Sequence, residues 1–351
     1  MSHYLPVRPD WLASYTETAI DPDVAIVDSH HHVWDIPEWR YMFEDVLADM
    51  RAGHRVIASV FVQCYSMYRK DGPKELRCIG ETEFANGVAA MSASGVYGDT
   101  RICDGIVGMA NLTAGAEVER VLEAHVRAAG ERFKGIRQIT AYDDEPAIHN
   151  KKWGLAAGIA GDAGFRAGYR RLGRMGLSFD AYVFHTQLGE LAGLARAEPE
   201  TTLVLNHVGA PVGIGRFAGQ REAVAKAWRA GIAELAACPN VFVKLGGMGM
   251  ATVGFDFHQQ AQPPSSDMLS AAWAPYMDYC IEKFGPGRCM FESNFPVDKG
   301  SCSYVVLWNA FKKIARRYTA AEQFQLFAGT AGAVYRLPSV AALSTTRVVA
   351  T

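Results

Sequence analysis

Three consecutive histidines, His30, His31 and His32, follow a short apolar run at residues 24–27. The run has the length and β-branched content of a buried strand. Because side chains alternate along a strand, we expect Asp28, His30 and His32 to point to one side and His31 to the other. Two imidazoles on one strand face can share a metal ion or clamp one polar ligand. Buried imidazoles need partners, so this strand end is a candidate site; the alternative is a set of core histidines bonded to backbone.

Further polar side chains stand where later apolar runs of the chain end. They carry amide, guanidinium, imidazole and carboxylate groups: Gln63, Asn111, Arg137, His185, His207, Glu292 and Asn294. The bodies of these runs are almost continuously apolar, apart from Asp180 and Lys244. We expect Lys244 to pair with a carboxylate inside the fold, and a substrate contact is the alternative. In a barrel of parallel strands the site lies at the C-terminal strand ends, so these polar groups are predicted to converge.

The elements that would position them are eight strand-helix units, with two helices after the eighth strand. Strands are predicted at 24–27, 55–64, 102–112, 133–139, 178–184, 201–206, 241–245 and 288–295. Helices are predicted at 41–52, 81–92, 118–129, 163–175, 188–197, 221–237, 267–284, 304–317 and 321–337. Parallel strands need crossover helices, and eight such units close into an α/β (β/α)8 TIM barrel. The alternative, a doubly wound open sheet, predicts a glycine-rich phosphate turn after the first strand, where this chain has histidines.

No linker-like segment divides the chain, so we predict one barrel domain over residues 1–351. Residues 1–22 are expected to be an irregular lead-in, because prolines interrupt any helix there, and 338–351 a loose tail. Two polar, glycine-containing stretches, 141–161 and 251–264, are expected to be loops that determine substrate specificity.

Composition excludes several classes of partner. The chain has 351 residues, 49% of them hydrophobic, and 35 Lys and Arg against 37 Asp and Glu. This balance gives no reason to expect nucleic acid or an anionic membrane, and it leaves a small-molecule substrate; a homo-oligomer stays open. The first twenty residues lack a basic start followed by an apolar core, so no secretory signal is expected, and no apolar run approaches a membrane span of about 20 residues. Seven scattered cysteines without a C-x-x-C pair favour a reducing cytoplasm.

Five segments together resemble the amidohydrolase-related (amidohydrolase 2) family of the amidohydrolase superfamily, and above all its lactonase branch. They read DSHHHVWD (28–35), FKGIRQ (133–138), LNHVGAP (205–211), FESNFPVD (291–298) and AGTAGAVYRL (328–337). The branch includes 2-pyrone-4,6-dicarboxylate lactonase and sugar-acid lactonases. The resemblance implies a (β/α)8 barrel and a hydrolase that opens a lactone or related cyclic ester. Its substrate would be small and carboxylated, and water would attack a polarised carbonyl.

The resemblance also implies residue roles. His30 and His32 correspond to the family's H-x-H pair, His207 to its strand-six histidine, and Arg137 to an arginine that holds a substrate carboxylate or carbonyl. Asn294 stands where the family usually has an aspartate that acts as general base. An amide can donate or accept hydrogen bonds, but it cannot take a proton near neutral pH.

Three substitutes for that base are open: Glu292 two residues earlier, Asp298 just beyond Pro296, or a nearby histidine. Glu292 would do no chemistry if it were paired to Arg or Lys inside the barrel. The candidate catalytic residues are therefore His30, His32, His207, Glu292 and Asn294. The candidate substrate contacts are Gln63, Arg137 and His185.

One divalent metal, zinc or manganese, would be held by His30, His32 and His207. Such an ion would lower the pKa of its water to about 7. A metal-free site, in which the imidazoles polarise the carbonyl directly, is the other possibility. The superfamily implies a second reaction as well, metal-dependent non-oxidative decarboxylation. A catalytically degenerate barrel that only binds its ligand is the third reading, because Asn294 replaces the base.

Overall fold

The computed structural model describes residues 4–37, 39–148 and 156–341. Residues 149–155 of the predicted loop at 141–161, and residues 342–351 of the predicted tail, lie outside the described residues. Within the described tail, Val340 is buried.

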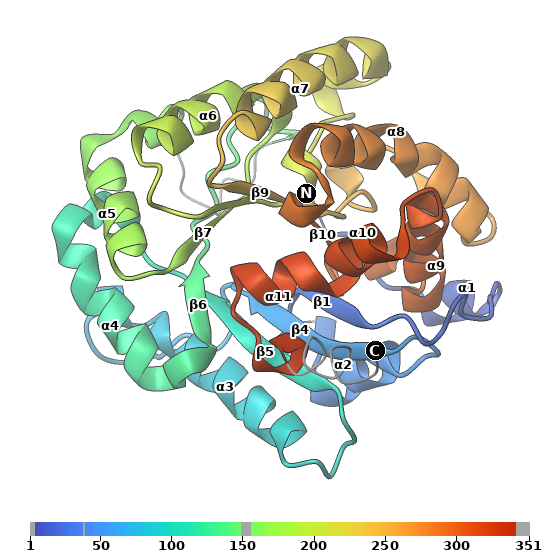
Figure 1. The fold of residues 1–351 in the computed structure, drawn as a ribbon, viewed down its shortest axis with the longest axis horizontal. Coiled ribbons are helices and arrows are strands. Elements are labelled where there is room, and N and C mark those ends of the chain that lie inside the picture. The colour runs from blue at the N-terminus through green and yellow to red at the C-terminus, as the bar shows by residue number, and fades with distance from the viewer. Residues whose placement is uncertain (1–3, 38, 149–155, 342–351) are drawn as a thin grey trace.

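Eight parallel strands form the wall of a barrel (Figure 1). They are β1 (Ile26–His31), β4 (Val56–Val62), β5 (Arg101–Gly108), β6 (Phe133–Ile136), β7 (Ser178–Ala181), β8 (Leu203–Leu205), β9 (Val241–Leu245) and β10 (Cys289–Phe291). Each pairs with the next along the chain. The residues after β10 return to β1, since the Asn294 N–H donates to the His30 carbonyl and the His32 N–H to the Phe295 carbonyl, each at 2.8 Å. The predicted (β/α)8 barrel is confirmed, and a doubly wound open sheet is excluded.

Helices surround this wall. They are α2 (Phe43–Met50), α3 (Ile79–Ala93), α4 (Val118–Ala129), α5 (Ala163–Arg174), α6 (Leu188–Ala197), α7 (Arg221–Ala236), α8 (Ser266–Phe284) and α9 (Tyr304–Ala315). Apolar residues recur on one face, as in α4, where Val118, Val121, Leu122 and Ala129 are buried. The helix predicted at 321–337 consists of α10 (Ala320–Phe324), a π-helical turn at Gln325–Gly329 and α11 (Thr330–Val334). The lead-in contains one short helix, α1 (Pro9–Ala13). None of the helices in the described parts of the chain has the length and hydropathy of a membrane span.

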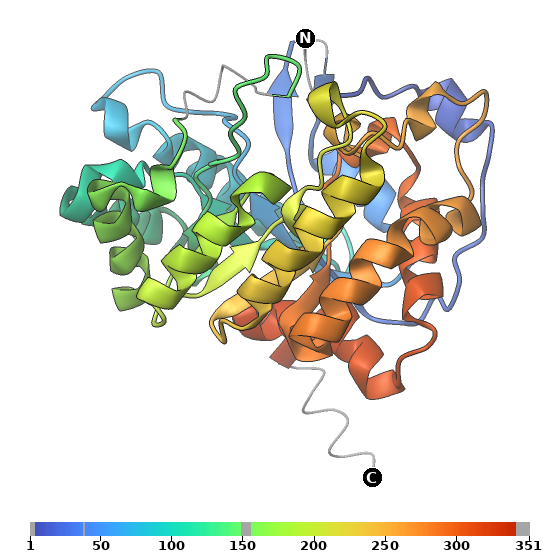
Figure 2. The same ribbon diagram turned by 90° about the horizontal axis from the view of Figure 1, so that it is seen from above.

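The last helices close one end of the barrel. Tyr335 and Leu337, which follow α11, join a buried cluster with strand residues that include Val27, Val60 and Val204. Figure 2 shows α10 and α11 in red at the lower end, and the β2–β3 hairpin at the opposite end. This cluster closes the lower end of the barrel.

The hairpin of β2 (Trp34–Ile36) and β3 (Trp39–Tyr41) is an element that the sequence analysis missed. A helix was expected from Tyr41, but α2 begins at Phe43. Aromatic residues stabilise the hairpin: the Tyr4 ring lies 5.8 Å from Trp34 and 5.3 Å from Trp39, centroid to centroid. The lead-in is thereby attached to the upper end of the barrel.

The predicted alternation along β1 holds for the three histidines and is wrong for Asp28. His31 points away from the barrel interior, with Nε2 2.9 Å from the Ser59 hydroxyl. Asp28 points outward too, because it accepts a hydrogen bond of 3.1 Å from the Tyr304 hydroxyl of α9. The pairing of β1 with β4 shifts between Asp28 and His31. Such an irregularity inserts a residue and reverses the alternation, which a strict period of two cannot anticipate.

Lys244 pairs with a carboxylate, as expected from the sequence, and the structure shows that this carboxylate belongs to Asp180. Lys244 Nζ donates to Asp180 Oδ2 at 2.6 Å, and both side chains are fully buried between β9 and β7. The Tyr335 hydroxyl (2.9 Å) and the Asn206 amide (3.2 Å) donate to the same oxygen. Lys244 therefore has the structural position that the sequence analysis expected.

His125 of α4 is a buried histidine remote from the strand ends. Its Nε2 lies 2.8 Å from the Met109 carbonyl and its Nδ1 2.8 Å from the Thr82 hydroxyl. Since a carbonyl only accepts, Nε2 carries the proton and Nδ1 accepts one from Thr82. Burial lowers the pKa of His125 to about 4.

Because the pKa of His125 is lower in the folded protein than in the unfolded chain, His125 contributes to the free energy of unfolding at neutral pH. Acidification is expected to remove this contribution. The folded pKa lies below the unfolded value near 6.5, so the contribution is complete above about pH 6.5 and is lost as the pH falls towards 4. The loss should reach about 3 kcal/mol. Urea midpoints at pH 4.5 and 7 measure it, and His125→Gln should show a smaller pH dependence than the wild type. Burial raises the pKa of Glu81 to about 7, which acts in the opposite direction in both proteins. Equal pH dependence in the two proteins would contradict the prediction.

Candidate active site

Five side chains from four strand ends meet at the upper end of the barrel. His30 and His32 come from the end of β1, Arg137 directly follows β6, His207 follows β8, and Glu292 directly follows β10. All five are buried. The His30 ring lies 4.9 Å from the His32 ring and 4.7 Å from the His207 ring, centroid to centroid. The structure thus brings together histidines that lie far apart in the sequence.

The Glu292 carboxylate lies between two imidazoles. Its Oε1 accepts the His207 backbone N–H at 2.9 Å and lies 2.7 Å from His207 Nδ1. Its Oε2 lies 2.7 Å from His30 Nδ1. His207 has a φ of 56°, a left-handed conformation that costs energy in a non-glycine residue. Gly247 leaves room for the ring, because a Cβ there would lie 2.4 Å from His207 Nδ1. The partners of Glu292 are therefore histidines, not the Arg or Lys considered from the sequence.

The hydrogen bonds fix the tautomers of His207 and His32. His207 Nδ1 faces a carboxylate and carries the proton, so its Nε2 keeps the lone pair. His32 Nδ1 donates to the Val62 carbonyl at 2.8 Å, which leaves a lone pair on its Nε2 as well. The His32 ring stacks on Trp34 at 5.4 Å. Burial, followed by the Arg137 guanidinium, lowers the pKa of His32 well below its usual value, so this imidazole is neutral at pH 7.

Arg137 connects the strand ends of β4, β6 and β1. Its Nε donates to Gln63 Oε1 at 2.8 Å, and its Nη2 donates to the Gln63 backbone carbonyl. Its Nη1 lies 3.1 Å from His30 Nε2. Burial, and then the nearby Lys244 and Arg137 charges, lower the pKa of His30 well below that of free histidine. Gln63 therefore contributes to the site by accepting two hydrogen bonds that hold Arg137 in place.

Three of these residues fit a divalent cation. Donor atoms of His30, His207 and Glu292 lie within 4.8 Å of one another, and all three side chains are buried. His30 Nδ1 and Glu292 Oε2 lie 2.7 Å apart, and neither atom has another hydrogen-bond partner among the described residues. Two imidazoles and a carboxylate are ligands that zinc accepts. The set differs from the one expected from the sequence, because Glu292 takes the place of His32.

Asn294 and Asp298 form a pair beside this cluster. The Asn294 side-chain amide donates to Asp298 Oδ1 at 2.8 Å. Asp298 Oδ2 accepts the Gly249 backbone N–H at 2.9 Å. Burial, with a smaller contribution from the Glu292 charge, raises the pKa of Asp298 to about 7.

A cavity of about 40 Å³ opens between these residues. It is lined by Tyr4, His32, Arg137, Ile139, Tyr182, His207, Met250, Thr252, Asn294 and Val297. This volume accommodates about three water molecules. Tyr4 and Tyr182 were not among the site residues predicted from the sequence. Tyr182 directly follows β7 and packs edge-on against His207 at 5.1 Å, so its strand-end position was the available signal. Tyr4 comes from the lead-in, where no pattern indicated it.

Two strand-end residues from the sequence analysis lie elsewhere. His185 is not among the residues that line the cavity; its Nδ1 accepts the Val212 N–H at 3.3 Å and its ring packs on Phe217 at 4.9 Å. Burial lowers the pKa of His185 to about 4. Asn111 is exposed, and its side chain accepts the Thr113 N–H at the start of a short helical turn.

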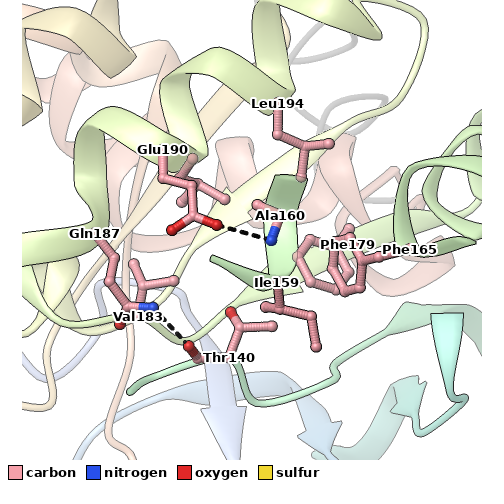
Figure 3. A pocket seen from close by; sticks show the side chains of 10 residues that line it. Thr140, Ile159, Ala160, Phe165, Phe179, Val183, Gln187, Glu190 and Leu194 are labelled. Atoms are coloured by element: carbon pink, nitrogen blue, oxygen red, sulfur yellow. Dashed lines mark hydrogen bonds between the residues drawn. The ribbon is translucent and has the colours of Figure 1, made fainter. Parts of the chain in front are cut away.

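A second cavity lies between α5, α6 and β7 (Figure 3). Its volume is about 10 Å³, enough for about one water molecule. Glu190 accepts the Ala160 N–H at 2.8 Å there, and Gln187 donates to the Thr140 carbonyl at 2.8 Å. Its remaining lining is mostly apolar and contains no histidine. This cavity is therefore a packing gap.

Comparisons with known proteins found similar sequences and a similar solved structure. The family model described as "Amidohydrolase" matches residues 27–337. The protein y4mH of Sinorhizobium fredii, described as uncharacterized, is 31% identical over 338 residues, which cover 90% of this chain and 99% of that one. The L-fucono-1,5-lactonase of Burkholderia multivorans is 28% identical over 326 residues, with coverages of 90% and 97%. The crystal structure of a zinc-bound amidohydrolase from Burkholderia multivorans has a TM-score of 0.67 at 26% identity, covering 90% of this chain and 100% of that one.

Proposed function

The chain belongs to the amidohydrolase family, and from that membership we propose that it is a lactonase, a hydrolase that opens a small cyclic ester. The observation that carries the proposal is the Glu292 carboxylate held between His30 and His207, beside a cavity lined by Arg137 and Asn294. The similarity to an L-fucono-1,5-lactonase supports a sugar-acid 1,5-lactone as the substrate class. The seven cysteines are free thiols, which supports a reducing cytoplasm as the compartment.

Arg137 would orient the substrate. A guanidinium has five N–H groups, and the contacts with Gln63 and His30 engage Nε, Nη1 and Nη2 once each. The remaining N–H groups can donate to a substrate carbonyl or carboxylate in the cavity. Negative charge that develops on the carbonyl oxygen during attack would be stabilised by this fixed cation.

His32 would move the proton. Its Nε2 holds a lone pair at neutral pH and can accept a proton from the attacking water while the water oxygen bonds to the carbonyl carbon. When the bond from that carbon to the ring oxygen breaks, His32 returns the proton to the ring oxygen. The product is a hydroxy acid, and one water has been added across one ester bond. The amide oxygen of Asn294 can accept the second hydrogen of the water and hold it in line.

His30, His207 and Glu292 would hold a divalent cation, which supplies, when bound, a water molecule of lowered pKa and a polarised carbonyl. Protein purified without chelator is expected to contain about one equivalent of zinc or manganese per chain. Elemental analysis measures this content, and Glu292→Ala should lower it, because the variant removes one of the three ligands. An active protein with less than about one-tenth equivalent would contradict the metal assignment and favour direct catalysis by imidazole.

The function is tested with a panel of sugar-acid 1,5-lactones and carboxylated lactones. Ring opening releases one proton at neutral pH, so a pH indicator follows the reaction above the spontaneous rate. We expect saturable turnover of at least one lactone. Release of carbon dioxide from unsaturated or aromatic acids without ring opening would favour a decarboxylase. Ligand-induced shifts in thermal stability without turnover would favour a binding barrel. Either result would contradict the proposal.

A further inference from the structure

The contact between Asn294 and Asp298 fixes the orientation of an amide in the cavity wall. Asn294 lines the cavity, and its amide donates to Asp298 Oδ1 at 2.8 Å. Asp298 accepts this amide at Oδ1 and the Gly249 N–H at Oδ2, so the amide nitrogen of Asn294 faces Asp298. The acceptor end of the amide, Oδ1, is consequently the end left for the cavity.

Asp298 is itself held firmly. It is fully buried, and its Oδ2 accepts the Gly249 backbone N–H at 2.9 Å. A Cβ on Gly249 would lie 2.9 Å from Asp298 Oδ2, so only glycine permits this approach. The Asp298 backbone N–H also donates to the Asn294 carbonyl at 3.2 Å, which ties the two residues together at both main chain and side chain. No ion pair with Asp298 occurs among the described residues. A buried carboxylate balanced only by N–H donors is costly, which indicates a function.

We propose that Asp298 is a positioning residue for the hydrolysis. It holds the Asn294 amide so that its oxygen faces the cavity and orients the attacking water, and positions 294 and 298 act as one unit that contains a single carboxylate. This inference rests on the proposed function and extends it. Asp298 is a buried acid that does not line the cavity, and it acts on the reaction through Asn294.

The unit has room for only one carboxylate. An aspartate at position 294 would place two carboxylate oxygens about 2.8 Å apart, where both cannot stay ionised. Asn294→Asp alone should therefore lower activity, although it introduces a potential base. In the exchanged variant, Asn294→Asp with Asp298→Asn, an amide at position 298 again donates to a carboxylate at position 294. The hydrogen bond and the single charge are both restored.

The test is a set of steady-state kinetic measurements with the best lactone of the panel. Asp298→Asn should lower kcat by about a hundredfold with KM changed less than about twofold, because water is positioned for the chemical step and not for substrate binding. In the Asn294→Ala background, Asp298→Asn should have little further effect. The exchanged variant should recover kcat to within about tenfold of the wild type. Glu190→Gln, which alters a carboxylate in the second cavity, is the matched control and should keep wild-type kinetics.

Circular dichroism and thermal midpoints establish that each variant folds. If Asp298→Asn alone does not fold, the inference is tested by comparing the other two variants. The kcat of the exchanged variant should exceed the kcat of Asn294→Asp. The inference would be overturned if the loss of kcat in the exchanged variant equalled the product of the losses in the two single variants. It would also be overturned if Asp298→Asn raised KM without lowering kcat. The lactonase assignment would stand in both cases. A wild-type protein that opens no lactone would overturn both.

Discussion

Glu292→Gln is expected to lower kcat/KM for lactone opening by about a thousandfold. The Glu292 carboxylate accepts the His207 backbone N–H, pairs with His207 Nδ1 and approaches His30 Nδ1, so one charge orients two imidazoles. Glutamine keeps the side-chain volume but removes that charge. Its amide offers only one acceptor oxygen, so at least one imidazole loses its partner. Steady-state kinetics with the best lactone of the panel measure the effect.

Glu190→Gln is the matched control for this loss. Glu190 also accepts a backbone N–H, that of Ala160, but in the second cavity (Figure 3). It should keep wild-type kcat/KM. Far-ultraviolet circular dichroism should show the same helical content in both variants. If Glu292→Gln folds and loses less than about tenfold, Glu292 is not the centre of the site.

The largest expected loss of stability comes from Lys244→Met. Lys244 is the cation paired with Asp180 at 2.6 Å, and neither side chain is exposed. Its removal leaves a buried carboxylate without a countercharge, which costs about 3–5 kcal/mol of the free energy of unfolding. Urea unfolding, followed by fluorescence and circular dichroism, measures the change.

A second substitution separates loss of charge balance from loss of packing. Lys244→Met combined with Asp180→Asn removes both charges and should recover a large part of the loss, since an amide at position 180 can still accept from Tyr335. Lys283→Met, which breaks an exposed ion pair with Glu282, should cost less than about 1 kcal/mol. Equal losses for Lys244→Met and Lys283→Met would contradict the importance of the buried pair.

The sequence predicted the barrel because its signals were strong and local. Helix α6 has the predicted bounds, Leu188–Ala197, and all eight strands occur where apolar runs were found. The hairpin of β2 and β3 was missed because each strand has only three residues, too few for a periodicity of two to be recognised. The outward position of Asp28 depends on a register shift against β4, which is a property of the pairing and not of β1 alone.

The site was predictable to the extent that strand ends determine it. His30, Arg137, His207 and Glu292 converge because parallel strands place their C-terminal ends at one rim. His185 stands four residues beyond the end of β7, and by that distance the chain has turned towards Phe217. The contribution of Tyr4 depends on how the lead-in packs against Trp34, a tertiary contact that no local pattern encodes.

Hydrolysis in ¹⁸O-labelled water tests directly whether water attacks the carbonyl carbon of a lactone in this site. The product is then examined by mass spectrometry and ¹³C nuclear magnetic resonance. We expect one labelled oxygen in the carboxylate of the hydroxy acid and an unlabelled hydroxyl derived from the ring oxygen, formed faster than in buffer alone. Label in the hydroxyl group, or no ring opening above the spontaneous rate with any lactone, would contradict this mechanism.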